Sequence, residues 1–295
     1  MANLALTETS NQETADIDLM DSLQIAQTLN NEDKKIALAV EKTLPEIAEA
    51  IELIARCFQK SGRLGYFGAG TSGRLGVLDA SECPPTFGVS PELVCGYIAG
   101  GESALRLSVE NAEDRSDLAL QDIVKFNPGN NDVVVVISSS GNPQYLLTVL
   151  QEARQRGAHT VSICCNPQAQ AKALSDIFIN PVVGPEPITG SSRMKAGTAQ
   201  KMVLNMLSTG AMIRIGKVYH NYMIDVRMLN AKLIDRGIRI VCDITGVSRE
   251  DAEKYLAASQ NNVKTACVMA VKKCDKDTAE NLLQQTNGLL RKIIG

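Results

Sequence analysis

The sequence predicts an α/β fold: a mostly parallel sheet with helices on both faces, followed by an all-helical C-terminal subdomain. Two observations carry this prediction. From Leu64 to about residue 190, short apolar strand-like runs alternate with helix-like stretches. From about residue 220 onward, only helical patterns remain. A chain of 295 residues is long enough to bury one large core and to carry a smaller appendage.

The strands and helices of the sheet region are expected in strict alternation. Before them, Ile47, Ile54 and Phe58 recur at helical spacing and mark one buried helix face, whereas residues 1–20 are polar and read as an arm. The expected strands are 64–68, 93–98, 132–138, 159–164 and 176–180. The expected helices between them lie near 73–80, 102–124, 143–156 and 167–174.

The C-terminal third changes character after Gly190. A long helix is predicted over 193–216, and Ser248 followed by acidic residues is typical of a helix N-cap. Further helices are expected near 222–235, 248–257, 261–272 and 276–285. We therefore expect three parts: an N-terminal arm with helices over 1–50, a sheet domain over 51–219, and a helical subdomain over 220–295.

Composition excludes several classes of partner. The net charge is −3 with no basic run, and aromatic residues make up only 4% of the chain, so a nucleic acid partner is not expected. No apolar run approaches the roughly 20 residues that span a bilayer, and the N-terminus lacks the pattern of a signal peptide. The eight cysteines form no C-x-x-C pair, and His159 and His220 are far apart, so no metal site is expected. These features favour a cytoplasmic protein.

Two Gly/Ser/Thr loops follow expected strands and are the main functional signal. The first, Gly68–Gly73, includes Gly70, Thr71 and Ser72; the second, Ser138–Gly141, includes Ser139 and Ser140. Loops of this kind aim backbone N–H groups and hydroxyls past the strand ends, where α/β sheets bind ligands. Two such loops in one sheet favour a phosphate ester, and more specifically a phosphosugar.

The first loop also fits two other interpretations. It matches the dinucleotide motif G-x-G-x-x-G, but the next strand ends in Ala99-Gly100-Gly101, and Glu102 comes only after the turn. The glycines alone would also suit a tight turn, although this explains one loop better than two. In a third cluster, Thr189–Lys195, Ser191 or Ser192 is expected to cap a helix. Arg193 and Lys195 either add positive charge near the ligand or are solvated residues of the first helical turn.

A carboxylate pair is the candidate for acid/base chemistry. Pro84 and Pro85 predict that the helix after the first loop ends at about Glu82–Cys83, which would fix Glu82 at a rigid corner. A second acidic cluster, Glu110–Asp114, contains Glu113 and follows the next strand. Two carboxyls near a sugar suit paired acid/base catalysis, although a glutamate on a helix is most often a surface residue. Cys83 has no visible partner base that would make it a nucleophile.

Two long segments, Gly68–Phe87 and Gly190–Lys201, closely resemble N-acetylmuramic acid 6-phosphate etherases, which belong to the SIS (sugar isomerase) domain superfamily. The resemblance covers nearly the whole chain, from Asn31-Glu32-Asp33 onward. It implies a SIS-type α/β/α sandwich over 51–219 that binds a phosphosugar. It also implies cleavage of the C3 lactyl ether to N-acetylglucosamine 6-phosphate and D-lactate, in the recycling of cell-wall amino sugars, by a homodimer without cofactor.

The resemblance also implies roles for individual residues. Glu82 matches the proton donor to the departing lactate oxygen, and Glu113 matches the second acid/base residue, which removes the C2 proton. Ser138, Ser139 and Ser140 are expected to hold the phosphate, with Thr71 and Ser72 along the sugar. The full set of expected substrate-binding residues is Gly70, Thr71, Ser72, Ser138, Ser139, Ser140, Ser191 and Ser192.

The chain departs from the family pattern after the third strand. It has Ser139-Ser140-Gly141-Asn142-Pro143-Gln144 where the family commonly shows Ala-Ser-Gly-Arg-Thr-Pro, and it lacks an arginine near Ser10-Asn11. The substrate range therefore stays open. Two alternatives remain: an aldose–ketose isomerase of the same fold, and a phosphosugar sensor without catalysis.

Overall fold

The structure is a computed structural model that describes residues 6–226, 228 and 231–295. The chain forms two compact units. The first comprises the residues up to Ser81 together with Pro91–Ser208, and the second comprises Glu82–Ser90 and Thr209–Gly295. Within the described ranges, no helix has both the length and the apolar character required to cross a bilayer.

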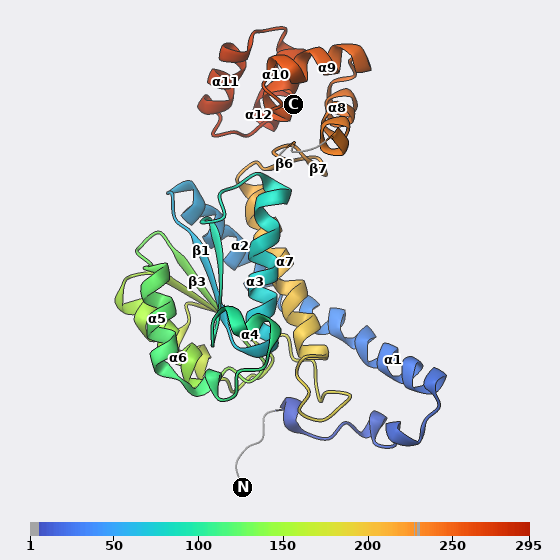
Figure 1. Cartoon of the computed structure of the whole chain (residues 1–295), viewed down its shortest axis with the longest axis vertical. Coiled ribbons are helices and arrows are strands. Elements are labelled where there is room, and N and C mark those ends of the chain that lie inside the picture. Colours follow the sequence, from blue (N-terminus) through green and yellow to red (C-terminus); the bar gives the residue numbers. More distant parts are fainter. Residues whose placement is uncertain (1–5, 227, 229–230) are drawn as a thin grey trace. The chain divides into compact units, whose positions relative to one another are not determined.

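The first unit is built on a five-stranded parallel sheet, which confirms the predicted fold class. The strand order is β2-β1-β3-β4-β5 (Figure 1). Its strands are β1 (Leu64–Gly68), β2 (Val94–Ile98), β3 (Val133–Ser138), β4 (His159–Cys164) and β5 (Ile177–Ile179). The chain adds β2 on one side of β1 and then returns to add β3 on the other side. The neighbouring strands β1 and β3 therefore form the switch point of the sheet, whose carboxyl ends are a usual site for ligands.

Helices cover both faces of this sheet, which explains why β3 consists of consecutive buried apolar residues. On one face, Val134 and Val136 pack with Phe126 and Tyr145 in a core formed with α5 (Ser116–Phe126) and α6 (Gln144–Gln155). The opposite face is covered by α3 and α7, with α2 beside them (Figure 1). The bounds of these three helices are α2 (Leu44–Gln59), α3 (Gly70–Phe87) and α7 (Lys195–Arg214).

The N-terminal arm is more ordered than its polar sequence indicates. It consists of three 3-10 turns, η1 (Leu6–Glu8), η2 (Gln12–Thr14) and η3 (Ile17–Leu19), which lead into α1 (Ser22–Glu41). Thr7, Asn11 and Thr14 are buried. The arm is therefore fixed by polar contacts rather than by an apolar face.

Two predicted helices differ from the structure. The single helix expected over 102–124 is divided into α4 (Glu102–Arg106), the 3-10 turn η4 (Ala112–Asp114) and α5. The break includes Asn111, whose φ of 59° no helix interior adopts. The stretch expected to form a helix near 167–174 is the 3-10 turn η5 (Gln170–Leu174).

The proline prediction was wrong: α3 continues through Pro84 and Pro85 and ends at Phe87. Each proline removes one backbone donor, but its fixed φ is close to the helical value. Both prolines lie in the last two turns, so the helix loses only the two hydrogen bonds that the N–H groups of residues 84 and 85 would donate. Gly88, with a φ of 66°, ends it and donates its N–H to Pro84 O at 3.0 Å.

The second unit is helical apart from one short hairpin. The hairpin strands are β6 (Val218–Tyr219) and β7 (Tyr222–Met223), which corrects the helix expected from 222, because His220 takes a φ of 51° at the turn. Part of that expected helix, at 227 and 229–230, lies outside the described residues. The helices are α8 (Ala231–Thr245), α9 (Arg249–Ala258), α10 (Val263–Lys272), α11 (Lys276–Gln285) and α12 (Arg291–Ile294). The Ser248 side chain caps α9 as predicted, by accepting from Asp251 N.

Candidate active site

A pocket of about 300 Å³ lies at the carboxyl ends of β1 and β3, and we call it the strand-end pocket. It brings together the two predicted hydroxyl loops, Glu113 and the segment before α7. Its lining residues are Thr7, Glu8, Ala69, Gly70, Thr71, Ser72, Glu113, Ile137, Ser138, Ser139, Ser140, Pro143, Leu146, Gly190 and Ser192. Of the ten residues predicted from the sequence, eight line this pocket; Ser191 and Glu82 do not.

The first loop presents the N-terminus of α3 to the pocket. The strand and the helix approach closely because a Cβ on Gly68 would lie 2.6 Å from Gly73 N. The first backbone N–H groups of a helix, here from Gly70 onward, have no partner within the helix and favour an anion. The Ser72 hydroxyl donates to Gln200 Oε1 at 2.8 Å, so this side chain is held by α7.

The serines of the second loop differ in their contacts: Ser138 forms a hydrogen bond within the loop, whereas the Ser139 hydroxyl is left unpaired. Ser138 Oγ accepts a hydrogen bond from Gly141 N at 2.9 Å and closes the turn. Gly141 has a φ of 71°, and a Cβ there would lie 2.4 Å from the Ala169 side chain, so only glycine fits. The buried Ser139 hydroxyl has no hydrogen-bond partner among the described residues. A buried, unpaired hydroxyl in a pocket wall is typical of a ligand-binding group.

Asn142, which stands where the family commonly has arginine, has a structural contact. Its Oδ1 accepts from Gln170 N at 3.0 Å and so ties the second loop to η5. Asn142 is exposed and does not line the strand-end pocket.

Glu113 lies in η4 and borders two cavities. Besides the strand-end pocket, it lines a neighbouring cavity of about 260 Å³, which shares Ala69 and Gly70 with that pocket. We call this second space the Arg74 cavity. Partial burial of the carboxyl, and then the charge of Asp114, raise the pKa of Glu113 above its ordinary value. A carboxylate with a raised pKa is a stronger base at neutral pH.

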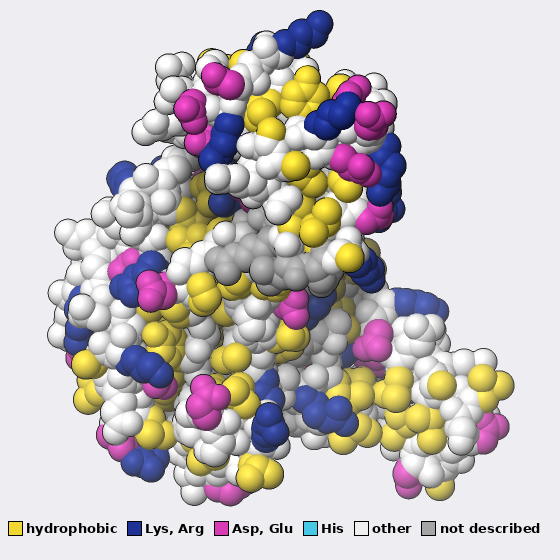
Figure 2. Space-filling view, turned by 45° about the horizontal axis from the view of Figure 1, so that its top comes forward, with side chains coloured by type: hydrophobic (Ala, Val, Ile, Leu, Met, Phe, Trp, Pro, Cys, Tyr) yellow, Lys and Arg dark blue, Asp and Glu magenta, His cyan; other side chains and the backbone are white. Residues whose placement is uncertain are grey.

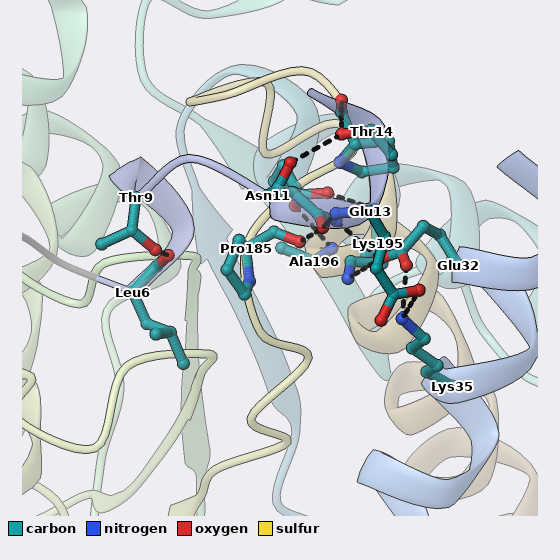
Figure 3. Close-up of polar contacts among 12 residues, drawn as sticks. Leu6, Thr9, Asn11, Glu13, Thr14, Glu32, Lys35, Pro185, Lys195 and Ala196 are labelled. Carbon is teal, nitrogen blue, oxygen red and sulfur yellow. Dashed lines mark hydrogen bonds and ion pairs between the residues drawn. The ribbon is translucent and has the colours of Figure 1, made fainter. Parts of the chain in front are cut away.

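A buried group of ion pairs, which we call the charge cluster, lies at the start of α7 (Figure 3). Lys195 Nζ donates to Glu32 Oε2 at 2.5 Å, and both side chains are at most 2% exposed. Lys35 pairs with the same carboxylate. Glu186 accepts from the backbone N–H groups of Lys195 and Ala196 at 2.8 and 2.9 Å. The charge cluster therefore fixes α1 and the segment before α7 to the first turn of that helix.

The interpretation of Lys195 as a solvated residue was wrong, because its side chain is buried; it also does not line the strand-end pocket. A lysine can be buried here because α1 supplies a carboxylate, a partner too distant in sequence to be inferred. Burial opposes ionisation of Glu32, but hydrogen bonds from Lys195, Lys35 and Asn11 outweigh it and lower the pKa of Glu32 to about 2. Arg193 is exposed and does not line the strand-end pocket.

The N-terminal arm contributes two pocket residues, Thr7 and Glu8, that the sequence analysis missed. Gly190 N donates to Thr7 O at 3.2 Å, and a Cβ on Gly190 would lie 2.9 Å from the Glu8 carboxylate. Asn11 Nδ2 donates to Glu32 Oε2 at 2.8 Å, which joins the arm to the charge cluster (Figure 3). No periodicity or motif marks these contacts in the sequence, because each is a single polar interaction.

The remaining predicted residues lie elsewhere. Ser191 is half-buried next to Ser192 but outside the pocket lining. Glu82 is exposed on α3 and belongs to the second unit, whereas Glu113 belongs to the first. Among the described residues, no group of three His, Cys, Asp or Glu side chains is arranged to hold a metal ion.

Comparisons with known proteins identify the family. Residues 46–154 match the N-terminal SIS domain of glucokinase regulatory protein, residues 109–210 the SIS domain, and residues 220–264 the C-terminal lid domain of glucokinase regulatory protein. The N-acetylmuramic acid 6-phosphate etherase of Glaesserella parasuis is 55% identical over 96% of this chain and 93% of its own length. The enzyme of the same name from Vibrio vulnificus is 53% identical over 97% of this chain and 95% of its own length.

Among solved structures, a phosphoheptose isomerase from Francisella tularensis has the same fold. It superposes with a TM-score of 0.51 at 16% identity, over 66% of this chain and all of that chain. This likeness supports the SIS fold, and the resemblance found in the sequence is confirmed by the full-length relatives. The chain belongs to the N-acetylmuramic acid 6-phosphate etherase family.

Proposed function

We propose that this protein is a carbon–oxygen lyase that cleaves the C3 lactyl ether of N-acetylmuramic acid 6-phosphate. The products are N-acetylglucosamine 6-phosphate and D-lactate, in the recycling of cell-wall amino sugars. The observation that carries the proposal is the strand-end pocket, where two hydroxyl loops and Glu113 meet in a chain of this family. An acid/base residue beside groups suited to a phosphate is the arrangement that this reaction requires.

The phosphate is bound by neutral donors. The described lining of the strand-end pocket contains no lysine or arginine. The available donors are the unpaired Ser139 hydroxyl, the Thr71 hydroxyl and the first N–H groups of α3. Holding the phosphate at a fixed point uses binding energy remote from the reacting bond to position C2 and C3.

Glu113 is the base in the proposed mechanism. In the open-chain sugar, the C1 aldehyde acidifies the C2 proton, and Glu113 removes it. The electron pair left on C2 forms the C2=C3 double bond as the C3–O bond breaks. Water then adds at C3 and a proton returns to C2, which gives N-acetylglucosamine 6-phosphate. The raised pKa of Glu113 suits this step, because a stronger base removes a carbon-bound proton more readily.

Glu82 is the proposed acid. The lactate oxygen is a poor leaving group unless it is protonated, and a glutamic acid at this position donates that proton. The Glu82 side chain is exposed on α3 and so is available to a ligand. The same carboxylate then activates the water that adds at C3.

We further propose a homodimer that acts in the cytoplasm. The N-terminal segment carries exposed apolar side chains, with Leu19, Leu23 and Leu38 at 79, 66 and 61% exposure. Figure 2 shows hydrophobic side chains gathered on the N-terminal segment at the lower right of the view. A second copy of the chain would cover such a surface. The eight cysteines are free thiols, as is typical of a reducing compartment.

The test is D-lactate release from N-acetylmuramic acid 6-phosphate by the purified protein, with Glu82→Gln beside it. We expect release by the wild type, and a loss of about 10²- to 10⁴-fold in Glu82→Gln with phosphosugar binding retained. Glu49→Gln, which removes an exposed carboxyl from α2, is the matched control and should be unaffected. Isomerisation of the phosphosugar without lactate would instead identify an isomerase. Tight binding without turnover at any pH would identify a sensor.

A further inference from the structure

We propose that the Arg74 cavity is the subsite for the lactyl group, and that the Arg74 guanidinium binds the lactyl carboxylate. This inference rests on the proposed function, because that substrate carries two anionic groups, a phosphate and a carboxylate. The strand-end pocket has donors suited to only one of them. The cavity next to it contains the one cation found in the described lining of either space.

Arg74 is half-buried and held in place at one side of its guanidinium. Its Nε donates to Leu105 O at 3.1 Å and its Nη2 donates to Leu107 O at 3.3 Å. A guanidinium has five N–H donors in a rigid plane, so the Nη1 donors remain for a ligand. Binding to two carbonyl groups fixes the direction of those donors without neutralising the charge.

The Arg74 charge has no acidic partner among the residues that the structure describes. This differs from Arg63, which pairs with Asp132 at 3.1 Å, and from Arg249, which pairs with Asp235 at 2.7 Å. Glu110 and Glu113 line the same cavity, yet neither forms an ion pair with Arg74. A fixed, half-buried and unpaired arginine in a cavity wall is suited to a carboxylate ligand.

Glu113 lies where the two cavities meet, which is where the reacting C3–O bond would lie. Glu113, Ala69 and Gly70 line both the strand-end pocket and the Arg74 cavity, so the two spaces meet at Glu113. A sugar in the first space with its lactyl group in the second would have the C3–O bond at this junction. The base would then lie beside C2, on the sugar side of the bond that breaks. At about 260 Å³, the Arg74 cavity is large enough for a three-carbon acid.

The experiment compares two ligands that differ only in the lactyl group. N-acetylmuramic acid 6-phosphate is measured by kcat/KM for lactate release, and N-acetylglucosamine 6-phosphate by its competitive inhibition constant. In Arg74→Gln we expect kcat/KM to fall by about 10- to 100-fold. The inhibition constant of the lactyl-free sugar should change by less than about 3-fold, because this sugar does not reach the guanidinium.

Two further variants separate binding from structural support. Arg74→Lys keeps the charge without the planar fork and should recover part of the loss. Arg106→Gln removes an exposed cation from the end of α4, outside the cavity lining, and should change neither constant. Equal weakening of both ligands in Arg74→Gln would overturn the proposal, since it would mean that Arg74 only supports residues 105–107.

The proposal can also be tested if the proposed function fails. If the wild type releases no lactate, the proposed function is wrong, and direct calorimetric binding of the same two phosphosugars replaces the kinetics. A wild-type preference for the lactyl sugar that Arg74→Gln abolishes would still support the subsite. Equal affinities of the wild type for the two sugars would overturn it.

Discussion

The strand-end pocket and the charge cluster lie in the same unit but use polar groups in opposite ways. In the charge cluster, Lys195 and Glu32 are buried and fully paired. In the pocket, the buried Ser139 hydroxyl has no partner among the described residues, and no cation lines the walls. The segment 189–195 illustrates the division, since Ser192 faces the pocket and Lys195 faces the cluster. The buried charges are thus paired within the scaffold, whereas a neutral donor in the pocket wall is left unpaired.

This contrast has a physical reason. A cation buried as deeply as Lys195 needs a carboxylate partner whether or not a ligand is bound, because an unpaired and fully buried charge is strongly unfavourable. Arg74 is only half-buried, so its charge is far less costly to leave without an acidic partner. Neutral hydroxyls and helix N–H groups cost much less to leave unpaired and still bind a dianion well. In the proposed complex, the carboxyls of Glu8 and Glu113, which line the same pocket, would accept hydrogen bonds from hydroxyl and amide groups of the sugar.

The largest expected effect is on catalysis. Glu113→Gln should lower kcat for lactate release by about 10²- to 10⁴-fold, because the amide cannot accept the C2 proton. Affinity for N-acetylglucosamine 6-phosphate, measured by calorimetry, should stay within about 3-fold, since no phosphate donor is lost. Glu102→Gln, which removes an exposed carboxyl of α4 outside both cavity linings, is the control and should keep most of its activity. A Glu113→Gln variant with near-normal kcat would remove this residue from the mechanism.

Changes in the charge cluster are expected to lower the stability of the fold. Glu32→Gln leaves Lys195 buried without its anion, so we expect a loss of about 3–5 kcal/mol in the free energy of unfolding. Urea denaturation measures this, with Glu41→Gln at the exposed end of α1 as the control. The double variant Glu32→Gln/Lys195→Met should recover part of the loss. If Glu32→Gln lowered the free energy of unfolding by less than about 1 kcal/mol, as the loss of a surface ion pair does, the pair with Lys195 would not contribute as a buried pair.

The same pair predicts how stability depends on pH. The folded-state pKa of Glu32, about 2, lies below the ordinary value of 4.5 for a glutamate. Its contribution is therefore fully present above pH 4.5 and is lost as the pH falls towards 2. The difference in stability between the wild type and Glu32→Gln should shrink across this acid range. A difference that stays constant from pH 6 to pH 3 would show that the carboxylate is not held by its cationic partners.

The smallest expected effects come from replacing Ser138 and Ser139, which should affect stability and binding separately. Ser139→Ala should weaken phosphosugar binding by about 10-fold and leave stability unchanged, because its hydroxyl has no protein partner to lose. Ser138→Ala should lower stability by about 1 kcal/mol, since Gly141 N loses its acceptor. Calorimetry and thermal unfolding measure both variants. The reverse pattern would mean that Ser138, rather than Ser139, is the ligand-binding hydroxyl.

The sheet was predictable because strand-like and helix-like stretches alternate along the sequence. The hydroxyl loops were predictable because each directly follows an expected strand. The buried strands β1 and β3 and the glycine turns after them follow from local chemistry, and parallel pairing then brings their ends together. Contacts between single distant residues were not predictable, as with Lys195 and Glu32, which are 163 positions apart. The predicted end of α3 was wrong, because the last turns of this helix accommodate Pro84 and Pro85.

The most direct test of the mechanism is the reaction run in deuterated, ¹⁸O-enriched water and followed by mass spectrometry of the sugar product. Elimination followed by hydration predicts deuterium at C2 and ¹⁸O at C3 of N-acetylglucosamine 6-phosphate, with neither label entering in Glu113→Gln. Lactate release without deuterium at C2 would contradict the account, because it would show that the ether breaks without removal of the C2 proton.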